Sequence, residues 1–318
     1  MPDAEYPRNL GEFDRWFATE AGCREYLVNV RWPTGFRCSH CTSDSAWLTR
    51  RGLMHCRGCG HQASITAGTI FHGTRSSLRL WFQAMWWVTA QKNGASALGL
   101  QRILGLGSYE TAWTWLHKLR RAMVRPGRDR LSGDVEVDET FVGGLEAGGG
   151  RRHVGKKVLI AIAVEIRGPA LGRIRLQPIR DSSAESLLPF VREAVNPGSR
   201  VITDGWPSYF GLTAAGYIHK RQVIRGSAES ADTLLPRVHR VASLLKRWLL
   251  GTHQGRPERA HLPYYLDEFT FRFNRRTSRY RGLLFHRLVQ QAVAIDPVPY
   301  GRLIGGAPAA RPTTSGHT

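Results

Sequence analysis

The chain has 318 residues and a formal charge of +20 at pH 7, from 45 lysines and arginines against 25 aspartates and glutamates. Hydrophobic residues make up 42% of it and ten residues are tryptophan, a composition that supplies about two domain cores and excludes a disordered basic protein. The longest apolar run, around Leu80 to Ala90, is too short to cross a bilayer. The polar, acidic N-terminus has no leader-like pattern, so we expect neither an integral nor a secreted protein.

The positive charge is concentrated in two blocks. Residues 31–130 hold fifteen lysines and arginines against three acidic residues, and residues 219–287 hold fifteen against five. Two basic blocks that flank a less biased middle predict two separate contacts with the backbone of a nucleic acid. The alternative is a surface of solvated arginines without a polyanionic partner.

The first 75 residues combine a predicted helix over residues 10–30 with a cysteine-rich unit over residues 31–75. Four of the five cysteines form two Cys-x-x-Cys pairs with fourteen residues between them: Cys38, Cys41, Cys56 and Cys59. Two such knuckles predict a closed tetrahedral zinc site, and Gly58 and Gly60 lie where a knuckle needs a positive φ or an absent Cβ. Two disulfides are the alternative, which a reducing cytosol would not maintain. Cys23 lies outside the pattern and is expected to be a buried small apolar residue.

Three helical segments follow. From Ser77, apolar and aromatic residues recur at helical spacing and predict a core-facing helix. Residues 96–104 and 109–123 predict two further helices joined by a glycine-containing turn, a pattern typical of a helix-turn-helix. In that interpretation the second helix enters the major groove of DNA, and its basic side chains bind the backbone: Lys118, Arg120 and Arg121. Other helical hairpins share this pattern, but the local positive charge favours DNA binding.

From Gly133 the hydrophobic period changes to two. Asp134–Val142 alternates, so that Glu136 and Asp138 share one face of a predicted strand. Further predicted elements are strands over residues 157–166, 173–179 and 200–203 and helices over residues 184–195 and 234–250. This order of elements predicts an α/β domain with a ribonuclease-H-like fold.

Two aspartates carry the predicted chemistry of this domain. Asp138 lies near the middle of the first strand, and Asp204 directly follows the strand over residues 200–203. If these strands are neighbours, the carboxylates lie within about 4–6 Å and repel unless a cation such as Mg²⁺ lies between them. Two such ions can activate a nucleophile and stabilise the leaving oxygen of a phosphodiester. Asp204-Gly205 equally fits an ordinary turn, so the residues alone indicate DNA binding and leave nuclease activity open.

Three stretches of the chain occur in a characteristic order. The first runs from Cys38 to Cys59 and on to residues 80–87 (LWFQAMWW), and the second is residues 137–144 (VDETFVGG). The third combines residues 243–247 (SLLKR), 265–269 (YLDEF) and 271–276 (FRFNRR). Together they resemble bacterial insertion-sequence transposases of the IS1595 family, in the ISXO2-like group. The similarity covers roughly residues 10–292. No single motif is decisive, but the co-linear set is.

The resemblance implies a zinc ribbon for DNA contact and a catalytic domain of the DDE type, which cleaves and joins DNA ends with two metal ions. Asp138 and Asp204 match the two aspartates of that family. The slot for the third ligand, seven residues before Lys246 and 35 after Asp204, is His239. On a helix, His239 and Lys246 would share one face about 10 Å apart, as a metal ligand and a cation that holds the phosphate of the transposon end.

The chain departs from the family pattern in the helix that carries this third ligand. His239 stands where the family more often has Glu, and Pro236 where it often has Asn. An imidazole is a softer ligand, so we expect a weaker second Mg²⁺ site and a preference for Mn²⁺. The alternatives are that His239 is a basic surface residue or that this copy is degenerate and inactive. Glu229 and Asp232 are the substitute ligands to consider.

Residues 264–292 are predicted to form a helical stretch that packs on the catalytic sheet and holds DNA on a basic outer face, through Arg275 and Arg276. Arg247, beside Lys246, is expected to contact DNA as well. The predicted domains are an N-terminal helix plus zinc ribbon (1–75), a helix-turn-helix-like segment with a basic linker (76–130), a ribonuclease-H-like DDE domain (131–295) and a disordered tail (296–318).

The resulting prediction is a DNA transposase that binds the ends of its insertion sequence and catalyses metal-dependent cleavage and strand transfer. It would use structural Zn²⁺ and catalytic Mg²⁺ or Mn²⁺, bind transposon ends and target DNA, and act as a homodimer or a larger assembly on DNA. We expect it in the bacterial cytoplasm, associated with the nucleoid. The alternatives are a zinc-dependent, sequence-specific DNA-binding regulator with an inactive nuclease-like domain, and a general nuclease.

Overall fold

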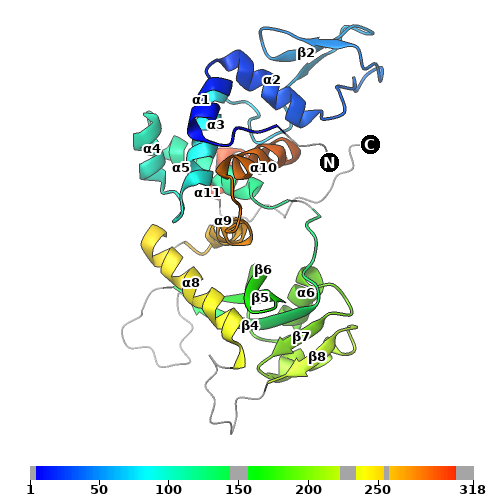
Figure 1. Cartoon of the computed structure of the whole chain (residues 1–318), viewed down its shortest axis with the longest axis vertical. Helices are drawn as coiled ribbons and strands as arrows, with labels where there is room; N and C mark the ends of the chain where they lie inside the picture. Colours follow the sequence, from blue (N-terminus) through cyan, green and yellow to red (C-terminus); the bar gives the residue numbers. More distant parts are fainter. Residues whose placement is uncertain (1–4, 126, 144–156, 223–233, 254–257, 306–318) are drawn as a thin grey trace. The chain divides into compact units, whose positions relative to one another are not determined.

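The computed structural model describes residues 5–125, 127–143, 157–222, 234–253 and 258–305. They divide into two compact units, drawn in Figure 1. Unit 1 combines the chain up to residue 126 with the segment from Thr277 onward, and unit 2 is Gly127–Arg276. Among the described residues, none of the helices has the length and hydrophobicity that crossing a membrane requires.

Unit 1 contains a small sheet and a group of helices. The strands pair antiparallel in the order β1-β2-β3 and are β1 (Ala46–Leu48), β2 (Leu53–Cys56) and β3 (Gln62–Ser64). The helices are α1 (Leu10–Trp16), α2 (Glu20–Arg31), α3 (Leu78–Ala90), α4 (Ala97–Leu104), α5 (Tyr109–Ala122), α10 (Arg281–Ala294) and α11 (Tyr300–Ile304). The predicted helices of this region are therefore confirmed in kind and approximate position.

Side-chain caps explain where five of these helices begin. In each case the residue before the first turn accepts a hydrogen bond from the backbone N–H three residues later, and these residues are Asn9, Thr19, Ser77, Ser96 and Ser108. The single helix predicted over residues 10–30 is two helices, because Thr19 caps a new one three residues after Trp16 ends the first.

An aromatic core joins α10 to the N-terminal helices of unit 1. The ring of Phe285 in α10 lies 5.5 Å from the ring of Phe13, 5.6 Å from that of Phe17 and 5.5 Å from that of Phe82. All four rings are buried. Helix α10 therefore completes a hydrophobic core that α1, α2 and α3 begin.

This packing changes two of the predicted domain limits. The stretch over residues 264–292 is two helices, and only α9 (Leu262–Asn274) belongs to unit 2, whereas α10 belongs to unit 1. The catalytic domain was predicted to end at residue 295, whereas unit 2 ends at Arg276. The difference arises because Phe285 of α10 packs in the aromatic core of unit 1. The tail predicted from residue 296 includes α11, which packs near α5, and residues 306–318 lie outside the described residues.

Unit 2 is built on a five-stranded mixed sheet in the order β6-β5-β4-β7-β8. The strands are β4 (Asp134–Val142), β5 (Val158–Arg167), β6 (Ala170–Ile179), β7 (Arg200–Thr203) and β8 (Ile218–Arg221). Strands β4, β5 and β6 pair antiparallel, whereas β7 pairs parallel with both β4 and β8. The four predicted strands are confirmed as strands, and β8 is an edge strand that the sequence did not reveal.

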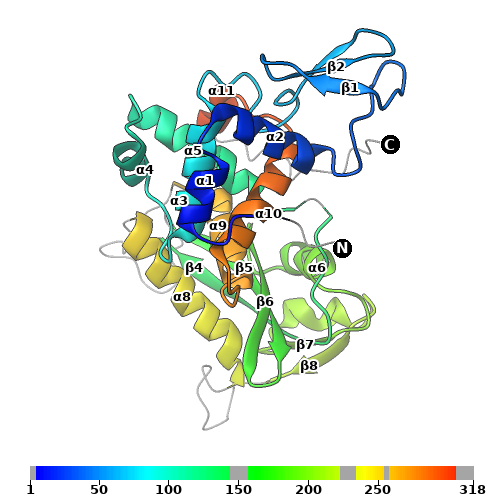
Figure 2. The same cartoon turned by 45° about the horizontal axis from the view of Figure 1, so that its top comes forward.

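Helices cover both faces of this sheet (Figure 2). On one face, α8 (Pro236–His253) and α9 pack against alternate residues of β5, such as Ile160. On the other face, α6 (Ala184–Ala194) and the 3₁₀ helix η1 (Pro207–Leu212) pack against the intervening residues, such as Ala161. Burial on both faces explains why β5 is a continuous apolar run.

Candidate active site and metal centre

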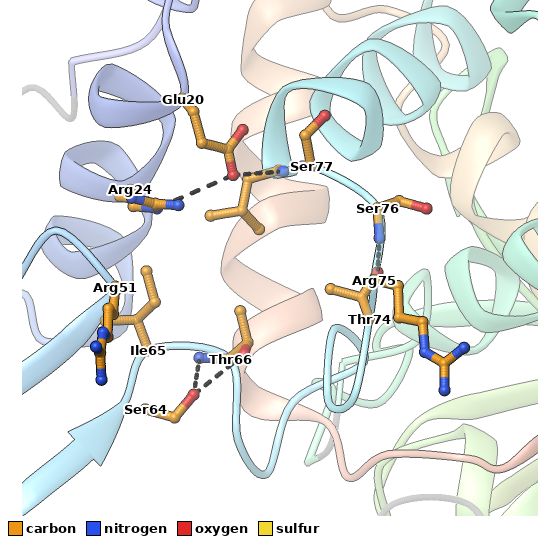
Figure 3. Close-up of a pocket in the computed structure, with 12 residues that line it drawn as sticks. Glu20, Arg24, Arg51, Ser64, Ile65, Thr66, Thr74, Arg75, Ser76 and Ser77 are labelled. Carbon is orange, nitrogen blue, oxygen red and sulfur yellow. Dashed lines mark hydrogen bonds and ion pairs between the residues drawn. The ribbon is translucent and has the colours of Figure 1, made fainter.

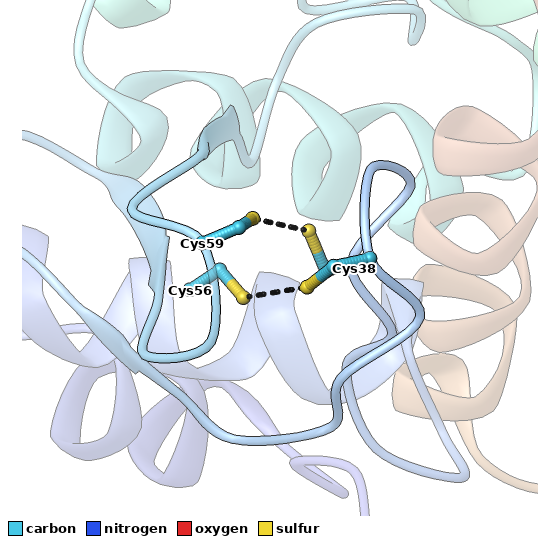
Figure 4. Close-up of side chains that lie close together, drawn as sticks. Cys38, Cys56 and Cys59 are labelled. Carbon is cyan, nitrogen blue, oxygen red and sulfur yellow. Dashed lines mark hydrogen bonds between the residues drawn. The ribbon is translucent and has the colours of Figure 1, made fainter.

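The four predicted zinc ligands lie together in unit 1, and Figure 4 labels three of them, Cys38, Cys56 and Cys59. The Sγ atoms of Cys38 and Cys59 are 3.6 Å apart and those of Cys41 and Cys56 are 3.5 Å apart, and all four lie within 4.8 Å of one another. Zn–S bonds of about 2.3 Å in a tetrahedron need sulfur separations of about 3.8 Å. The thiols are free, so the disulfide alternative is wrong. The four cysteines are positioned to bind a structural zinc ion.

The two knuckles that carry these cysteines are built alike. The N–H of Thr42 donates to the carbonyl of Cys38 at 2.9 Å, and the N–H of Gly60 donates to the carbonyl of Cys56 at 3.0 Å. Thr42 and Gly60 thus hold equivalent positions, and both have a positive φ, 59° and 73°. Gly58 is favoured for a different reason, because a Cβ there would lie 3.1 Å from the Cβ of Ser43 and 3.3 Å from the Cys41 Sγ, closer than ordinary contacts.

The thiol pKa values of the cysteines differ. Burial of the Cys56 thiol raises its pKa, but hydrogen bonds from the backbone N–H groups of Cys59 and Gly58 and from Cys41 lower that pKa more strongly, to about 6. The pKa of Cys59 is shifted the other way: the His61 N–H acts to lower it, but hydrogen bonds with Cys41, burial and hydrogen bonds with Cys38 and Cys56 raise it to about 12. A metal ion would bind the thiolate forms of these groups. Cys23 is fully buried, as predicted, and burial raises its pKa to about 12.

In unit 2, the sheet brings Asp138 and Asp204 to neighbouring positions. Strands β4 and β7 are parallel, with Val135 opposite Val201 and Glu136 opposite Ile202. When this register is continued by two residues, Asp138 lies beside Asp204, just beyond the end of β7. Strands β4 and β7 are therefore neighbours, as a site that contains both Asp138 and Asp204 requires.

Glu136 fixes the beginning of α8 on the same face of β4. Its buried carboxylate accepts hydrogen bonds from the backbone N–H groups of Arg237 at 2.8 Å and Val238 at 2.9 Å, and from the Arg237 guanidinium at 3.1 Å. These are N–H groups of the first turn, which have no partner within the helix. His239 is the next residue, and its Nε2 lies 3.7 Å from Oδ2 of Asp138.

Two neighbouring carboxyl groups of this site, those of Asp138 and Glu139, have raised pKa values. Burial raises the pKa of Asp138 to about 6, and the charge of Asp204 acts in the same direction, while the Glu139 N–H and His239 act against it. Burial also raises the pKa of Glu139 to about 7, although the Tyr209 hydroxyl donates to its carboxylate at 2.8 Å. A divalent cation near Asp138 and Asp204 would offset their mutual repulsion and favour the ionised form of Asp138.

Asp204 also closes a tight turn. Its Oδ1 accepts a hydrogen bond from the Trp206 N–H at 3.0 Å. The indole Nε1–H of Trp206 donates to the carbonyl of Ser182 at 3.1 Å, which holds the half-exposed ring in place. Asp204 is therefore a turn residue, as the alternative interpretation predicted. This role uses only Oδ1, so it does not prevent Oδ2 from binding another group.

The donor set of this site fits a divalent cation. Asp138 and Asp204 offer the oxygen ligands that Mg²⁺ prefers, and the imidazole of His239 suits Mn²⁺ better than Mg²⁺. All three residues are in the described part of the chain, and their ligand atoms do not all lie within 4.8 Å of one another. The three residues therefore form a looser group than the four cysteines. The substitute ligands Glu229 and Asp232 lie outside the described residues.

The basic residues predicted to bind DNA through α5 are only partly accessible. Arg120 is 3% exposed and donates to the carbonyl of Ala95 at 3.2 Å. The prediction that Arg120 contacts DNA is therefore wrong in this structure, because its guanidinium is committed inside unit 1. Lys118 and Arg121 are half-buried, and burial lowers the pKa of Lys118.

The other predicted basic contacts belong to unit 2 and differ from one another. Lys246 and Arg247 are exposed on α8. The guanidinium of Arg275 lies 4.1 Å from the ring centroid of Phe271, and that of Arg276 lies 4.2 Å from the ring of Phe273. Arg276 also donates to the carbonyl of Gly172 at 3.3 Å, so one function of this side chain is to hold the end of α9 on β6.

The sequence analysis missed two residues of the acidic site. Glu139 occupies a position of β4 that alternates with Val135 and Val137 on the apolar face, and Tyr209 lies in a 3₁₀ helix that the pattern did not predict. The signal that was available is the acidic residue in an otherwise apolar period. Such a residue needs a buried partner, which the Tyr209 hydroxyl provides.

Comparison with known proteins identifies the family of both parts of the chain. A family model described as the ISXO2-like transposase domain matches residues 130–274, and a transposase zinc-ribbon model of the same family matches residues 18–62. Together the two ranges cover more than half of the chain. The chain belongs to the IS1595 family of transposases. The resemblance noted in the sequence is thereby confirmed.

A protein from a transposable element is also similar to this chain. A protein of Halobacterium salinarum, described as an uncharacterized protein in transposable element ISH50, is 25% identical over 279 residues. The aligned region covers 80% of this chain and 91% of that protein. The IS1595 zinc-ribbon match includes all four cysteines, and the transposase-domain match includes Asp138, Asp204 and His239. The chain thus carries a transposase-family domain together with a zinc ribbon.

Proposed function

We propose that this protein is an active DNA transposase, which binds the ends of its insertion sequence and cleaves and joins DNA at a site formed by Asp138, Asp204 and His239. The observation that carries the proposal is the convergence of these three residues from β4, the end of β7 and the first turn of α8, within a transposase-family domain. A chain with a formal charge of +20 supports a polyanionic substrate.

The domain assignments predicted above belong to the same proposal. Three antiparallel strands, a helix and a strand parallel to the first support a ribonuclease-H-like fold for unit 2. Helices α4 and α5, with Gly105 in the left-handed conformation between them, support a helix-turn-helix. We propose Lys118, Arg121 and Arg247 as backbone contacts, and a homodimer or larger assembly on DNA in the bacterial cytoplasm, associated with the nucleoid.

In the proposed site, Asp138, Asp204 and His239 would hold divalent ions, Mg²⁺ or Mn²⁺. Bound there, such ions supply an activated oxygen nucleophile and stabilise the oxygen that leaves the phosphodiester. The protein's own groups have separate tasks. Glu136 orients the first turn of α8, and the exposed Lys246, two turns beyond His239, is placed to attract a DNA phosphate.

The test is end cleavage by the purified zinc-loaded protein, on DNA that carries the element's own flanking ends, with Mg²⁺ and with Mn²⁺. Asp138→Asn and His239→Ala should each abolish nicking and leave end binding intact. Asp134→Asn is the matched control, since Asp134 lies on the same strand and pairs with Arg200. Cleavage by Asp138→Asn at the wild-type rate would show that the site is wrongly assigned.

A second function is favoured by one observation, the lack of a compact ligand cluster at Asp138, Asp204 and His239. A zinc-dependent DNA-binding regulator with an inactive catalytic domain would bind the ends specifically and show no nicking with either metal. A general nuclease would cut without preference for the ends. The same experiment therefore separates all three functions.

A further inference from the structure

The three-stranded sheet of the zinc ribbon has one buried face and one exposed face. On one face, Met54 and Cys56 of β2 are buried. The residue between them, His55, lies on the other face, because successive side chains of a strand alternate. In the strand pairing, His55 stands opposite Trp47 of β1 and opposite Gln62 of β3. Trp47, His55 and Gln62 therefore form a row across the sheet, on the face away from the buried side chains.

An arginine adjoins this row. The ring centroids of Trp47 and His55 are 4.2 Å apart, and the guanidinium of Arg57 lies 5.4 Å from the centroid of the Trp47 ring. Trp47 is nevertheless 42% exposed, and Arg57 and Gln62 are exposed. We call Trp47, His55, Arg57 and Gln62 the ribbon face. It combines a large aromatic ring, fixed by its two neighbours, with hydrogen-bonding groups that solvent can reach.

The polar groups of the ribbon face have capacity for a partner. Within the part of the chain that the structure describes, neither the Arg57 guanidinium nor the Gln62 amide makes a hydrogen bond or an ion pair. Nδ1 of His55 is buried and also lacks a hydrogen-bond partner there. A guanidinium offers several donors in one plane, and an amide offers donors and an acceptor together. The matching partner has acceptors and donors close to one another on one surface.

The surrounding charge favours a nucleic acid as that partner. Residues 31–75 contain six arginines and one acidic residue, Asp44. In the major groove of DNA, arginine pairs bidentately with guanine and glutamine with adenine. Three strands at their usual spacing span about 10 Å, and the major groove is about 12 Å wide. Strands of a β-sheet are an established way to read a groove.

The sheet that presents the ribbon face is held at both ends. The cysteine knuckles lie at one end, and at the other Arg31 of α2 donates to the carbonyls of Ser64 at 3.0 Å and Ile65 at 2.7 Å. In the same segment the Thr66 N–H donates to the Ser64 hydroxyl at 3.2 Å, beside a polar pocket that α2 also lines (Figure 3). A face on such a fixed support loses little conformational freedom when it binds.

We propose that the ribbon face enters the major groove of the transposon end and reads base edges there. Arg57 pairs with a guanine and Gln62 with an adenine, and the Trp47 ring makes an apolar contact beside Arg57. The inference rests on the proposed function, because it takes the ends of the insertion sequence as the DNA that is recognised. It gives the zinc ribbon a part in sequence recognition, in addition to contact with the DNA backbone.

The experiment measures equilibrium binding of the zinc-loaded protein to an end-containing duplex and to a scrambled duplex of the same length and composition. The parent protein and all variants carry Asp138→Asn, so that cleavage does not interfere. Arg57→Ala and Gln62→Ala should each lower the ratio of the two affinities about tenfold, because each removes a bidentate base contact. Both side chains are exposed, so the zinc content of the variants should equal that of the parent.

The matched control is Arg37→Ala. Arg37 is exposed in the same ribbon, but it precedes the first knuckle and lies outside the three strands. Its loss removes the same charge as Arg57→Ala and should leave the ratio of affinities unchanged, because a contact with phosphate carries no sequence information.

A scan with single 7-deazapurine substitutions in the end then identifies the bases that are read. Each substitution replaces N7, an acceptor in the major groove, by a C–H group and leaves the base pair intact. One substituted guanine should weaken binding by the parent protein and have no further effect on Arg57→Ala. One substituted adenine should behave in the same way toward Gln62→Ala.

Three results would overturn the inference and leave the proposed function standing. Equal losses on the two duplexes would mean that the face contacts phosphates alone. Unchanged binding by both variants would mean that the face has another partner, such as a second copy of the chain. A lower ratio without any effect of the 7-deazapurines would place the contact outside the major groove. Failure of the parent protein to prefer the ends would instead overturn the proposed function, and the inference with it.

Discussion

The zinc site of this transposase-family chain and the acidic site proposed to hold divalent ions differ in how they are assembled. The zinc ligands come from two knuckles between Cys38 and Cys59, and their four sulfur atoms lie within 4.8 Å of one another. The acidic site takes its ligands from residues as distant as Asp138 and His239, and its three ligand atoms do not form so compact a group. One site is compact and local, and the other is looser and takes its residues from distant parts of unit 2.

This difference corresponds to two kinds of metal chemistry. A closed site with four protein ligands leaves no position for a substrate, so its ion serves the fold. If two carboxylates and an imidazole hold an ion, they supply only part of its ligands, so positions would remain for the oxygen atoms of a substrate, as a catalytic ion requires. Removing the metal or a ligand should therefore damage the structure in the first case and the chemistry in the second.

Loss of zinc should have the largest effect. Cys56→Ser, or a zinc chelator, should unfold the ribbon, because metal binding supplies about 10–16 kcal/mol to such small modules. Tryptophan fluorescence follows this directly, since eight of the ten tryptophans precede residue 126. Asp138→Asn is the comparison variant, and its unfolding midpoint should equal or exceed that of the wild type without divalent ions. A chelator-resistant ribbon would show that the closed site does not hold the fold together.

Loss of the Glu136 carboxylate should affect both the fold and the chemistry of unit 2. Glu136→Ala leaves two backbone N–H groups and the Arg237 guanidinium without their acceptor, at a cost of about 3 kcal/mol in the free energy of unfolding. It should also lower end cleavage, since the first turn of α8 carries His239. Glu136→Gln keeps an acceptor and should cost less. Equal unfolding midpoints for the alanine variant and the wild type in urea would exclude Glu136 as the anchor of α8.

Features that depend on local sequence were predicted correctly, whereas features that depend on contacts between distant residues were missed or misjudged. Strand β4 was predicted with its observed limits because the alternation from Asp134 to Val142 is a local signal. The spacing of the four cysteines is also a local signal, and it predicted the zinc site. The edge strand β8 has no such signal, as its one apolar residue, Ile218, is 62% exposed. Arg120 was misjudged because both faces of α5 carry apolar or aromatic residues, and only tertiary contacts decide which face is buried.

Outside the zinc site, unit 1 contains a pH-sensitive contact. The Tyr26 hydroxyl lies 2.6 Å from Nδ1 of His286, and burial, with the charge of Arg287, lowers the pKa of His286 to about 4. A protonated His286 is disfavoured in the folded state, so the unfolded chain binds more protons between pH 4 and 6.5. Stability should therefore be fully present above pH 6.5 and should fall as the pH drops toward 4.

The loss at His286 should approach roughly 3 kcal/mol at pH 4. Urea unfolding of the zinc-loaded protein at pH values from 4.5 to 7.5 measures it, with tryptophan fluorescence as the signal for unit 1. His286→Gln should flatten the profile, whereas His72→Gln should not, since His72 is exposed. If the two variants have the same pH profile, the sensitivity arises elsewhere, for example in the zinc thiolates.

The smallest predicted effect compares the two halves of the zinc site with each other. Thr42 and Gly60 hold equivalent positions with positive φ, which costs an L-residue such as threonine about 1 kcal/mol and glycine almost nothing. Thr42→Gly should therefore raise the thermal midpoint of the ribbon, and Gly60→Ala should lower it by a similar amount. A Cβ at Gly60 would meet no atom within 4 Å, so the backbone conformation alone would account for the loss. If Thr42→Gly lowers the midpoint instead, the hydrogen bond from the Thr42 hydroxyl to the carbonyl of Cys41 outweighs the strain. The first knuckle would then depend on its side chain, and the second on its backbone.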